Sequence, residues 1–330
     1  MHKFFLHLLF ICYVFTSSVY FIEAEYKLEP IFYKFALFSF FTLYSLTCQF
    51  RKSINSLFLL LPVILIYVIG GLYDFAIMSM IFALSLPAVY KGIAEIKNRD
   101  VWFMFIIFFL PSIWAVMNNR FDLLFNSIYG RERMLLGYFH PKEAAISLFV
   151  IFFLWGFVQK DLPNLISTSL FGIVIYTIGS RNIAINLVIS WISKFKLIFY
   201  FLIISVVSLT LYLFFFDFDL INEFSSNRLD LWRGIAAYSM LSGDTIKFDS
   251  FIVETYVYSG FIGIFLLIYL YAFVYYKLRK SLNPNWKYYL LMIFVYQFID
   301  SGLTSIGNMY HILVWAVLLS FTRRQNVLKS

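Results

Sequence analysis

Arginine is distributed unevenly along this chain, and its side chain suits one particular chemistry. A guanidinium group is planar, stays charged and donates paired hydrogen bonds, which favours binding of phosphate and diphosphate. Six arginines fall in polar breaks that we expect on one face of a membrane: Arg120, Arg131, Arg133, Arg181, Arg228 and Arg233. This pattern predicts an anion site at the outer leaflet. The alternative interpretation is a set of solvated charges paired with nearby acids such as Asp122 and Asp230.

A second set of residues has the chemistry to accept a proton. His140 carries an imidazole, a side chain that can accept a proton near neutral pH, and Asp249 and Glu254 open a long apolar segment. Glu143 falls in the first turn of a helix that begins at Pro141, where negative charge is favoured, so the helix start accounts for it. Helix capping gives a similar alternative for Asp249. The candidate catalytic residues are therefore Asp249, His140 and Glu254.

Motifs for other kinds of chemistry are missing from the sequence. It contains no Gly-rich phosphate loop, no Cys/His metal-ligand spacing, no GxSxG motif and no HExxH motif. Asp217 and Asp219 form only a weak acidic pair. We therefore expect a metal-independent reaction with no cofactor.

The composition shows which elements must position these residues. Of the 330 residues, 62% are hydrophobic and only 13% are charged, whereas a soluble domain has about 25% charged residues. Many apolar runs approach the length that a helix needs to cross a bilayer. We therefore predict a single all-α integral membrane domain over residues 1–330. About twelve spans are expected, at 4–22, 31–48, 54–73, 75–90, 101–117, 139–158, 165–179, 182–193, 197–216, 251–275, 288–303 and 309–321.

The lysines and arginines between the spans predict their orientation. The net charge of +8 lies in short clusters rather than on a basic face, so membrane anchoring explains it better than nucleic-acid binding. Basic clusters after residues 193, 275 and 321 place both termini in the cytoplasm. This orientation puts residues 217–250 outside as one larger loop with an amphipathic helix. His7, inside the first span, is interpreted as a buried, hydrogen-bonded residue.

Three stretches together resemble the bacterial O-antigen and polysaccharide polymerases of the Wzy type, in the superfamily that includes the O-antigen ligases. They are Arg133-Met-Leu-Leu-Gly-Tyr-Phe-His-Pro-Lys-Glu-Ala-Ala, the Gly179-Ser-Arg-Asn-Ile-Ala turn, and Asn227-Arg-Leu-Asp-Leu-Trp-Arg followed by the Gly-rich segment after Asp249. Ligase relatives tend to have His-Asn where this chain has Asp249-Ser250, which favours a polymerase.

The resemblance implies a GT-C-like fold in the bacterial inner membrane, with the active site facing the periplasm. It implies that a sugar hydroxyl of one undecaprenyl-diphosphate-linked oligosaccharide attacks the anomeric carbon of another. In that reading Arg181 and Arg228 bind the leaving diphosphate, and Arg131, Arg133, Arg233 and Arg120 assist. Asp249 or His140 is the expected base. The implied partners are the lipid-linked oligosaccharide, membrane lipids and a chain-length regulator, with no nucleic acid.

Three other functions stay open at this point. An O-antigen ligase would perform the same chemistry on a lipid A core acceptor. A flippase or transporter for lipid-linked oligosaccharide should carry ionisable residues near mid-membrane, whereas here the charges gather at the outer face. A structural membrane subunit would leave the arginine distribution unexplained.

Overall fold

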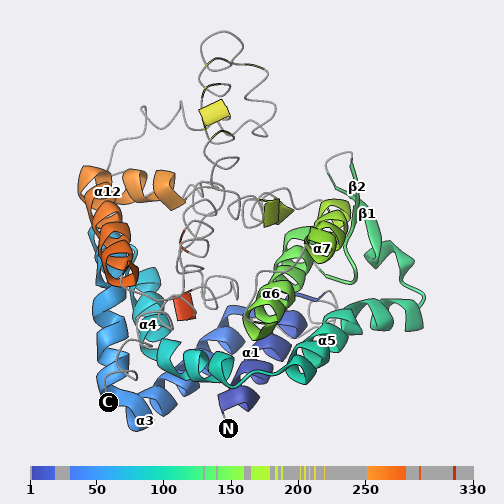
Figure 1. The fold of residues 1–330 in the computed structure, drawn as a ribbon, viewed down its shortest axis with the longest axis horizontal. Helices are drawn as coiled ribbons and strands as arrows, with labels where there is room; N and C mark the ends of the chain where they lie inside the picture. Colours follow the sequence, from blue (N-terminus) through green and yellow to red (C-terminus); the bar gives the residue numbers. More distant parts are fainter. Residues whose placement is uncertain are drawn as a thin grey trace.

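The structure is a computed structural model, and it is predominantly helical (Figure 1). It describes residues 2–18, 30–128, 131–138, 140–159, 165–178 and 251–279, with a few isolated positions further along. The described elements are α1 (His2–Thr16), α3 (Pro30–Ile69), α4 (Tyr73–Ala94), α5 (Asn98–Met117), η1 (Phe121–Leu123), β1 (Phe125–Ile128), β2 (Arg131–Met134), α6 (Pro141–Gln159), α7 (Leu165–Ile178) and α12 (Phe251–Leu278).

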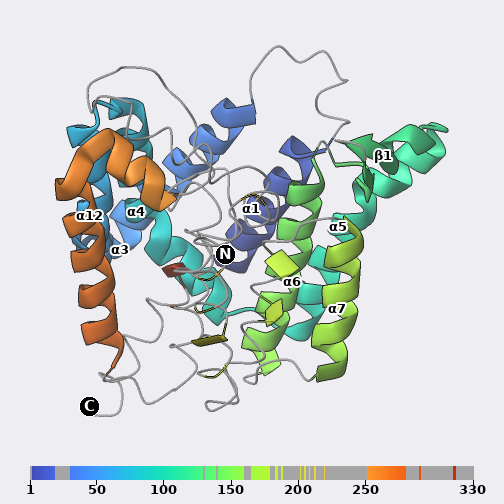
Figure 2. The same cartoon turned by 90° about the horizontal axis from the view of Figure 1, so that it is seen from above.

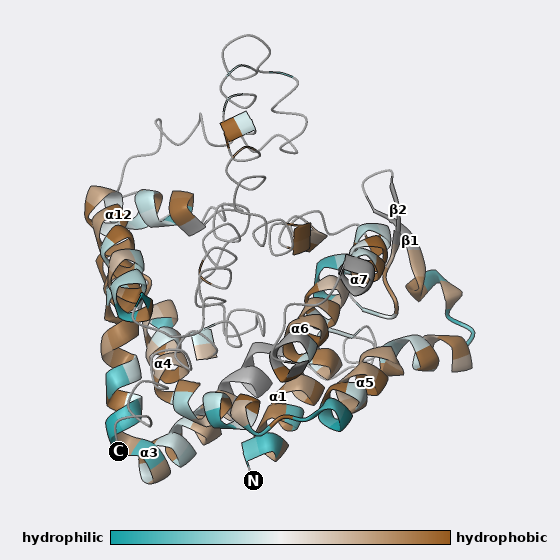
Figure 3. Ribbon diagram, in the orientation of Figure 1, coloured by the Kyte–Doolittle hydropathy of each residue, from teal (hydrophilic) through white to brown (hydrophobic). Residues whose placement is uncertain are grey.

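Four described helical stretches are long and apolar enough to cross a membrane: Phe38–Ile69, Tyr73–Ala94, Asn98–Met117 and Ile252–Leu278. Hydrophilic residues gather near the helix ends and connections, while the helix bodies are mostly hydrophobic (Figure 3). These features are those of a membrane protein, as the composition predicted.

The predicted spans agree with the described helices over most of the first half of the chain. The spans predicted at 75–90, 101–117, 139–158 and 165–179 correspond to α4, α5, α6 and α7, and the one at 251–275 corresponds to α12. The spans at 182–193, 197–216, 288–303 and 309–321, and the loop at 217–250, lie outside the described segments. The count of twelve therefore stays a prediction.

Two predicted spans, 31–48 and 54–73, form one helix, α3, which is kinked between them. Gln49 has non-helical backbone angles (φ −146°, ψ 36°) at the kink. The hydroxyls of Ser45 and Ser53 lie 2.9 Å apart across it, and both side chains are buried. The break predicted between the two spans is therefore present as a sharp kink at Gln49 rather than as a longer loop, and the paired serine hydroxyls lie on its two sides.

The first helix is shorter than predicted, since α1 ends at Thr16 rather than at residue 22. The Thr16 hydroxyl donates to the carbonyl oxygen of Cys12 at 2.8 Å, and the Ser18 hydroxyl donates to that of Phe15 at 2.7 Å. Ser18 then forms a β-bridge with Tyr138. Short hydroxyl side chains that bond to nearby carbonyls compete with helix continuation, which explains the early end.

The core lies where α1 packs against α3 and α4 and where α5 packs against α6. Large aromatic side chains fill it, including Phe10, Phe41, Phe82, Phe108 and Phe149, each almost completely buried. Seen from above, α3, α4 and α12 group on one side and α5, α6 and α7 on the other, with α1 between them (Figure 2). This arrangement makes α1 the element that both groups share.

Helix α12 is broken near its start, at Gly260 (φ 59°, ψ −151°). Next to the break, the Ser259 hydroxyl donates to the carbonyl oxygen of Ile66 at 2.6 Å. A Cβ atom added to Gly70 would lie 2.8 Å from the Cβ of Tyr258. The close approach of α12 to the end of α3 therefore depends on small residues in both helices.

Candidate functional site

The described candidate residues gather in the connection between α5 and α6, residues 118–140. Arg120 follows the end of α5, and its guanidinium group binds the Asp122 carboxylate through two hydrogen bonds, at 3.1 and 3.2 Å. The hydrogen bond from Arg120 holds the pKa of Asp122 below its ordinary value. Both side chains are well exposed. Arg120 is thus part of a surface ion pair, the arrangement that the alternative interpretation predicted.

Arg131 and Arg133 lie in β2, the second strand of a short antiparallel hairpin. In the register of the hairpin, Arg131 pairs with Ile128 and Arg133 with Asn126. This hairpin was not among the predicted elements, because strands of four residues with mixed polarity give little periodic signal. β2 also contacts α7, the helix after which Arg181 comes in the sequence (Figure 1).

A tight turn fixes the hairpin to α5 just before α6 begins. Gly137 has φ +78°, and a Cβ atom added there would lie 2.5 Å from both the carbonyl carbon and oxygen of Pro111. The Ser112 hydroxyl donates to the carbonyl oxygen of Leu136 at 2.8 Å. The buried Tyr138 hydroxyl donates a hydrogen bond to the carbonyl oxygen of Phe108 at 3.0 Å. These bonds hold the start of α6 against α5.

His140 caps the N-terminus of α6 in the structure. Its Nδ1 accepts a hydrogen bond from the backbone N–H of Lys142 at 3.1 Å, and its carbonyl oxygen accepts one from the N–H of Glu143 at 3.0 Å. A neutral ring that accepts at Nδ1 carries its proton on Nε2. In this arrangement the exposed ring is a hydrogen-bond donor, and its lone pair already serves the helix.

Glu143 has a partner from a distant part of the chain. Its carboxylate accepts a hydrogen bond from the hydroxyl of Tyr13, on α1. Tyr13 is buried, with only 4% of its surface exposed. The Ser147 hydroxyl donates to the Glu143 carbonyl oxygen at 2.9 Å. Local sequence carries no signal for the first contact, since 130 residues separate the two side chains.

The other predicted site residues lie elsewhere. Glu254 is half-buried in the first turn of α12. Helix α12 packs against α3, and both cartoon views show it away from α6 (Figures 1 and 2). Arg181, Arg228, Arg233 and Asp249 lie outside the described segments.

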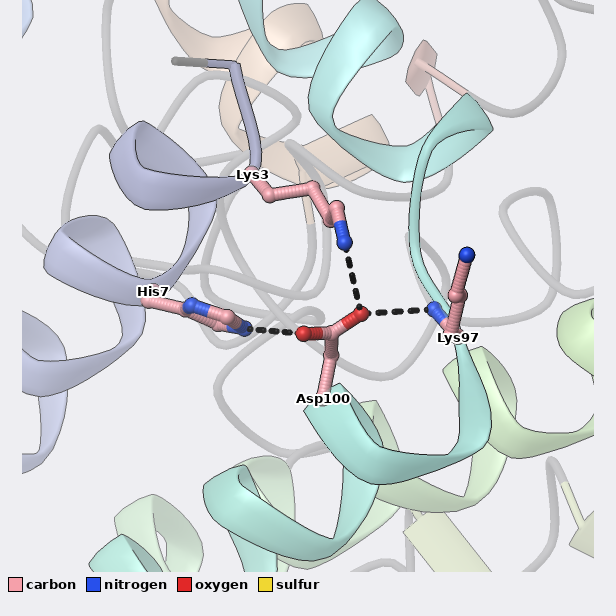
Figure 4. Close-up of polar contacts among 4 residues, drawn as sticks. All are labelled: Lys3, His7, Lys97 and Asp100. Carbon is pink, nitrogen blue, oxygen red and sulfur yellow. Dashed lines mark hydrogen bonds and ion pairs between the residues drawn. The ribbon is translucent and has the colours of Figure 1, made fainter.

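A second polar cluster joins the starts of α1 and α5 to the end of α4. The Asp100 carboxylate accepts from the backbone N–H of Lys97 at 2.8 Å and from Lys3 Nζ at 3.4 Å (Figure 4). His7 Nε2 lies 3.6 Å from the other carboxylate oxygen, a contact that becomes an ion pair only when the imidazole is protonated. This nitrogen atom is buried and has no hydrogen-bond partner among the described residues, so the structure does not supply the predicted hydrogen bond at Nε2.

The same end of α1 is also tied to α3 and α4. His2 Nδ1 lies 2.8 Å from a carboxylate oxygen of Glu95, and its Nε2 lies 2.8 Å from the hydroxyl of Tyr44. The distribution of lysines and arginines predicts that the start of α1, the end of α4 and the start of α5 lie on one side of the membrane. It predicts that the end of α1 and residue 138 lie on the other side. The contacts agree with that grouping. Which group faces the cytoplasm stays a prediction.

Among the residues that the structure describes, no three His, Cys, Asp or Glu side chains gather closely enough to hold a metal ion. Comparison of the chain with protein-family models, curated proteins and solved structures gives no match. The resemblance to the Wzy-type polymerases therefore stays a hypothesis that depends on the motifs in the sequence.

Proposed function

We propose that this protein is a polysaccharide polymerase of the Wzy type. It joins undecaprenyl-diphosphate-linked oligosaccharide repeat units at the outer leaflet of the bacterial inner membrane. The observation that carries the proposal is the connection between α5 and α6, which holds Arg131, Arg133 and His140 in one short segment. That segment contacts α7, which directly precedes the Gly179-Ser-Arg turn in the sequence.

The chemistry of the transfer explains why arginines are needed at such a place. As the bond between the anomeric carbon and the diphosphate breaks, negative charge develops on the leaving group. Fixed donors in a partly dry site stabilise that charge without reorganising. Arg181 and Arg228 are the proposed diphosphate ligands, and Arg131, Arg133 and Arg233 assist them.

Arg120 is a weaker candidate for binding the diphosphate. Its guanidinium group is already bound by Asp122 through two hydrogen bonds. To bind a diphosphate it would have to exchange one anionic partner for another. We therefore place it last among the proposed ligands.

Reconstitution tests the proposal directly. The purified protein, in liposomes with a lipid-linked repeat unit and no nucleotide, is expected to make a ladder of chain lengths and to release undecaprenyl diphosphate. Arg181→Ala is expected to abolish the ladder while the protein still inserts. Arg279→Ala is the matched control, because Arg279 stacks on Tyr276 at the far end of α12, 4.2 Å from the ring centre. A fully active Arg181→Ala protein would contradict the diphosphate site.

The same assay separates the alternatives. Transfer of the oligosaccharide only to a lipid A core acceptor would identify a ligase. Movement of an unextended lipid-linked unit across the bilayer would identify a flippase. We favour the polymerase because most ionisable residues of the described helices lie near the helix ends or, like Arg51 and Lys52, beside the break in α3, whereas a transporter needs them near mid-membrane.

A further inference from the structure

The hydrogen bond between Glu143 and Tyr13 brings together two residues that ordinary helix formation does not require to meet. A negative charge in the first turn of α6 needs no side-chain partner, because the helix N-terminus already favours it. Here, the partner is a buried phenol from α1, which holds the carboxylate in a defined place.

The Glu143 carboxylate also keeps lone pairs that the Tyr13 hydroxyl does not occupy, and these can accept a proton. An ionised carboxylate has about four lone-pair sites, and one phenol occupies one of them. The Tyr13 hydroxyl donates to one Glu143 carboxylate oxygen, and the Glu143 side chain is only half-buried. By contrast, Asp122 is bound twice by Arg120, and Asp100 lies at the opposite end of α1.

The backbone around Glu143 is fixed as well. The Ser147 hydroxyl and the carbonyl oxygen of His140 bond its backbone groups, and the turn at Gly137 locks the preceding residues onto α5. A base must be held within hydrogen-bond reach of the proton that it removes. Glu143 meets this requirement better than His140, whose Nδ1 lone pair is taken up by the helix cap.

We infer that Glu143 is the general base for the attacking hydroxyl and that Tyr13 is a positioning residue for it; this inference rests on the proposed function. Glu143 takes the proton of the sugar hydroxyl as its oxygen forms a bond with the anomeric carbon of the second unit. The bond from that carbon to the diphosphate breaks, and undecaprenyl diphosphate leaves with the electron pair. The proton then passes from Glu143 to solvent.

Three variants test the inference in the reconstituted assay. Glu143→Gln keeps an acceptor for the Tyr13 hydroxyl but cannot take a proton, so kcat is expected to fall by about 10²–10⁴-fold with little change in KM. Glu143→Ala is expected to regain activity when formate is added, because a small carboxylate can replace the missing base. Tyr13→Phe is expected to lower kcat about tenfold. Tyr44→Phe is the matched control, because it removes the same hydroxyl from a tyrosine that bonds His2 at the opposite end of α1.

The outcomes separate the inference from the proposed function. If the natural chain makes a ladder and Glu143→Gln stays within about twofold of it, Glu143 is not the base, while the polymerase stands. Loss of activity in Glu143→Ala without rescue by formate, in a variant that runs as a folded monodisperse protein, would also overturn the base role. If the natural chain makes no ladder from the correct lipid-linked unit, the polymerase itself is refuted, and the inference with it.

Discussion

Replacing Gly137 by alanine should destabilise the protein through the turn that holds the candidate site. Gly137 has φ +78°, which costs an L-residue about 1–2 kcal/mol. The added methyl group would also lie 2.5 Å from backbone atoms of Pro111, inside the contact distance. Backbone in the middle of α5 cannot rotate away as a side chain can, so overpacking adds about 1–3 kcal/mol. We expect a total loss of about 2–5 kcal/mol in the free energy of unfolding.

The measurement is reversible unfolding in mixed detergent micelles, followed by tryptophan fluorescence. Gly172→Ala provides the matched control, because Gly172 lies in α7 with ordinary helical angles and nothing within 4 Å of an added Cβ atom. That variant should be neutral or gain up to about 1 kcal/mol from helix propensity. Equal unfolding free energies for Gly137→Ala and the natural chain, within about 0.5 kcal/mol, would refute the close contact between this turn and α5.

Three further predictions concern charge and topology. Asp100→Ala should lower the free energy of unfolding by about 1–3 kcal/mol, because it removes the acceptor for the Lys97 N–H and a partly exposed ion pair. Asp100→Asn keeps the acceptor and should cost less, and the same unfolding assay compares the two variants. Arg120→Ala should raise the pKa of Asp122 towards its ordinary value, as followed by NMR of labelled aspartate. In the natural chain, this lowered pKa means that the pair stabilises the fold fully at pH values above the ordinary carboxyl pKa. The contribution is lost as the pH falls through the lowered pKa of Asp122. A cysteine placed within 224–248, on a cysteine-free background, should react with an impermeant reagent added outside; reaction only after lysis would reverse the topology.

The sequence alone determined the membrane class and most helix positions in the described segments. Apolar runs of bilayer length with charged breaks leave helices as the only structure that satisfies the backbone in lipid. The ends of α4, α5, α6 and α7 lie within a few residues of the predicted limits for that reason. The orientation rule likewise grouped the helix ends that the structure brings into contact, such as the start of α1 with the end of α4.

Tertiary structure decided what local pattern could not. The polar stretch around Gln49 predicts a break between two spans, and tertiary structure makes that break a single non-helical residue, with buried serine hydroxyls paired on both sides of it. The sequence predicts His140 as a base, but in the structure its Nδ1 accepts a hydrogen bond from the backbone N–H of Lys142 and so caps α6. Glu143 reads as a helix-start charge, and only the packing of α1 against the start of α6 gives it the Tyr13 phenol. Such partners come from distant parts of the chain, and periodicity within a segment cannot encode them.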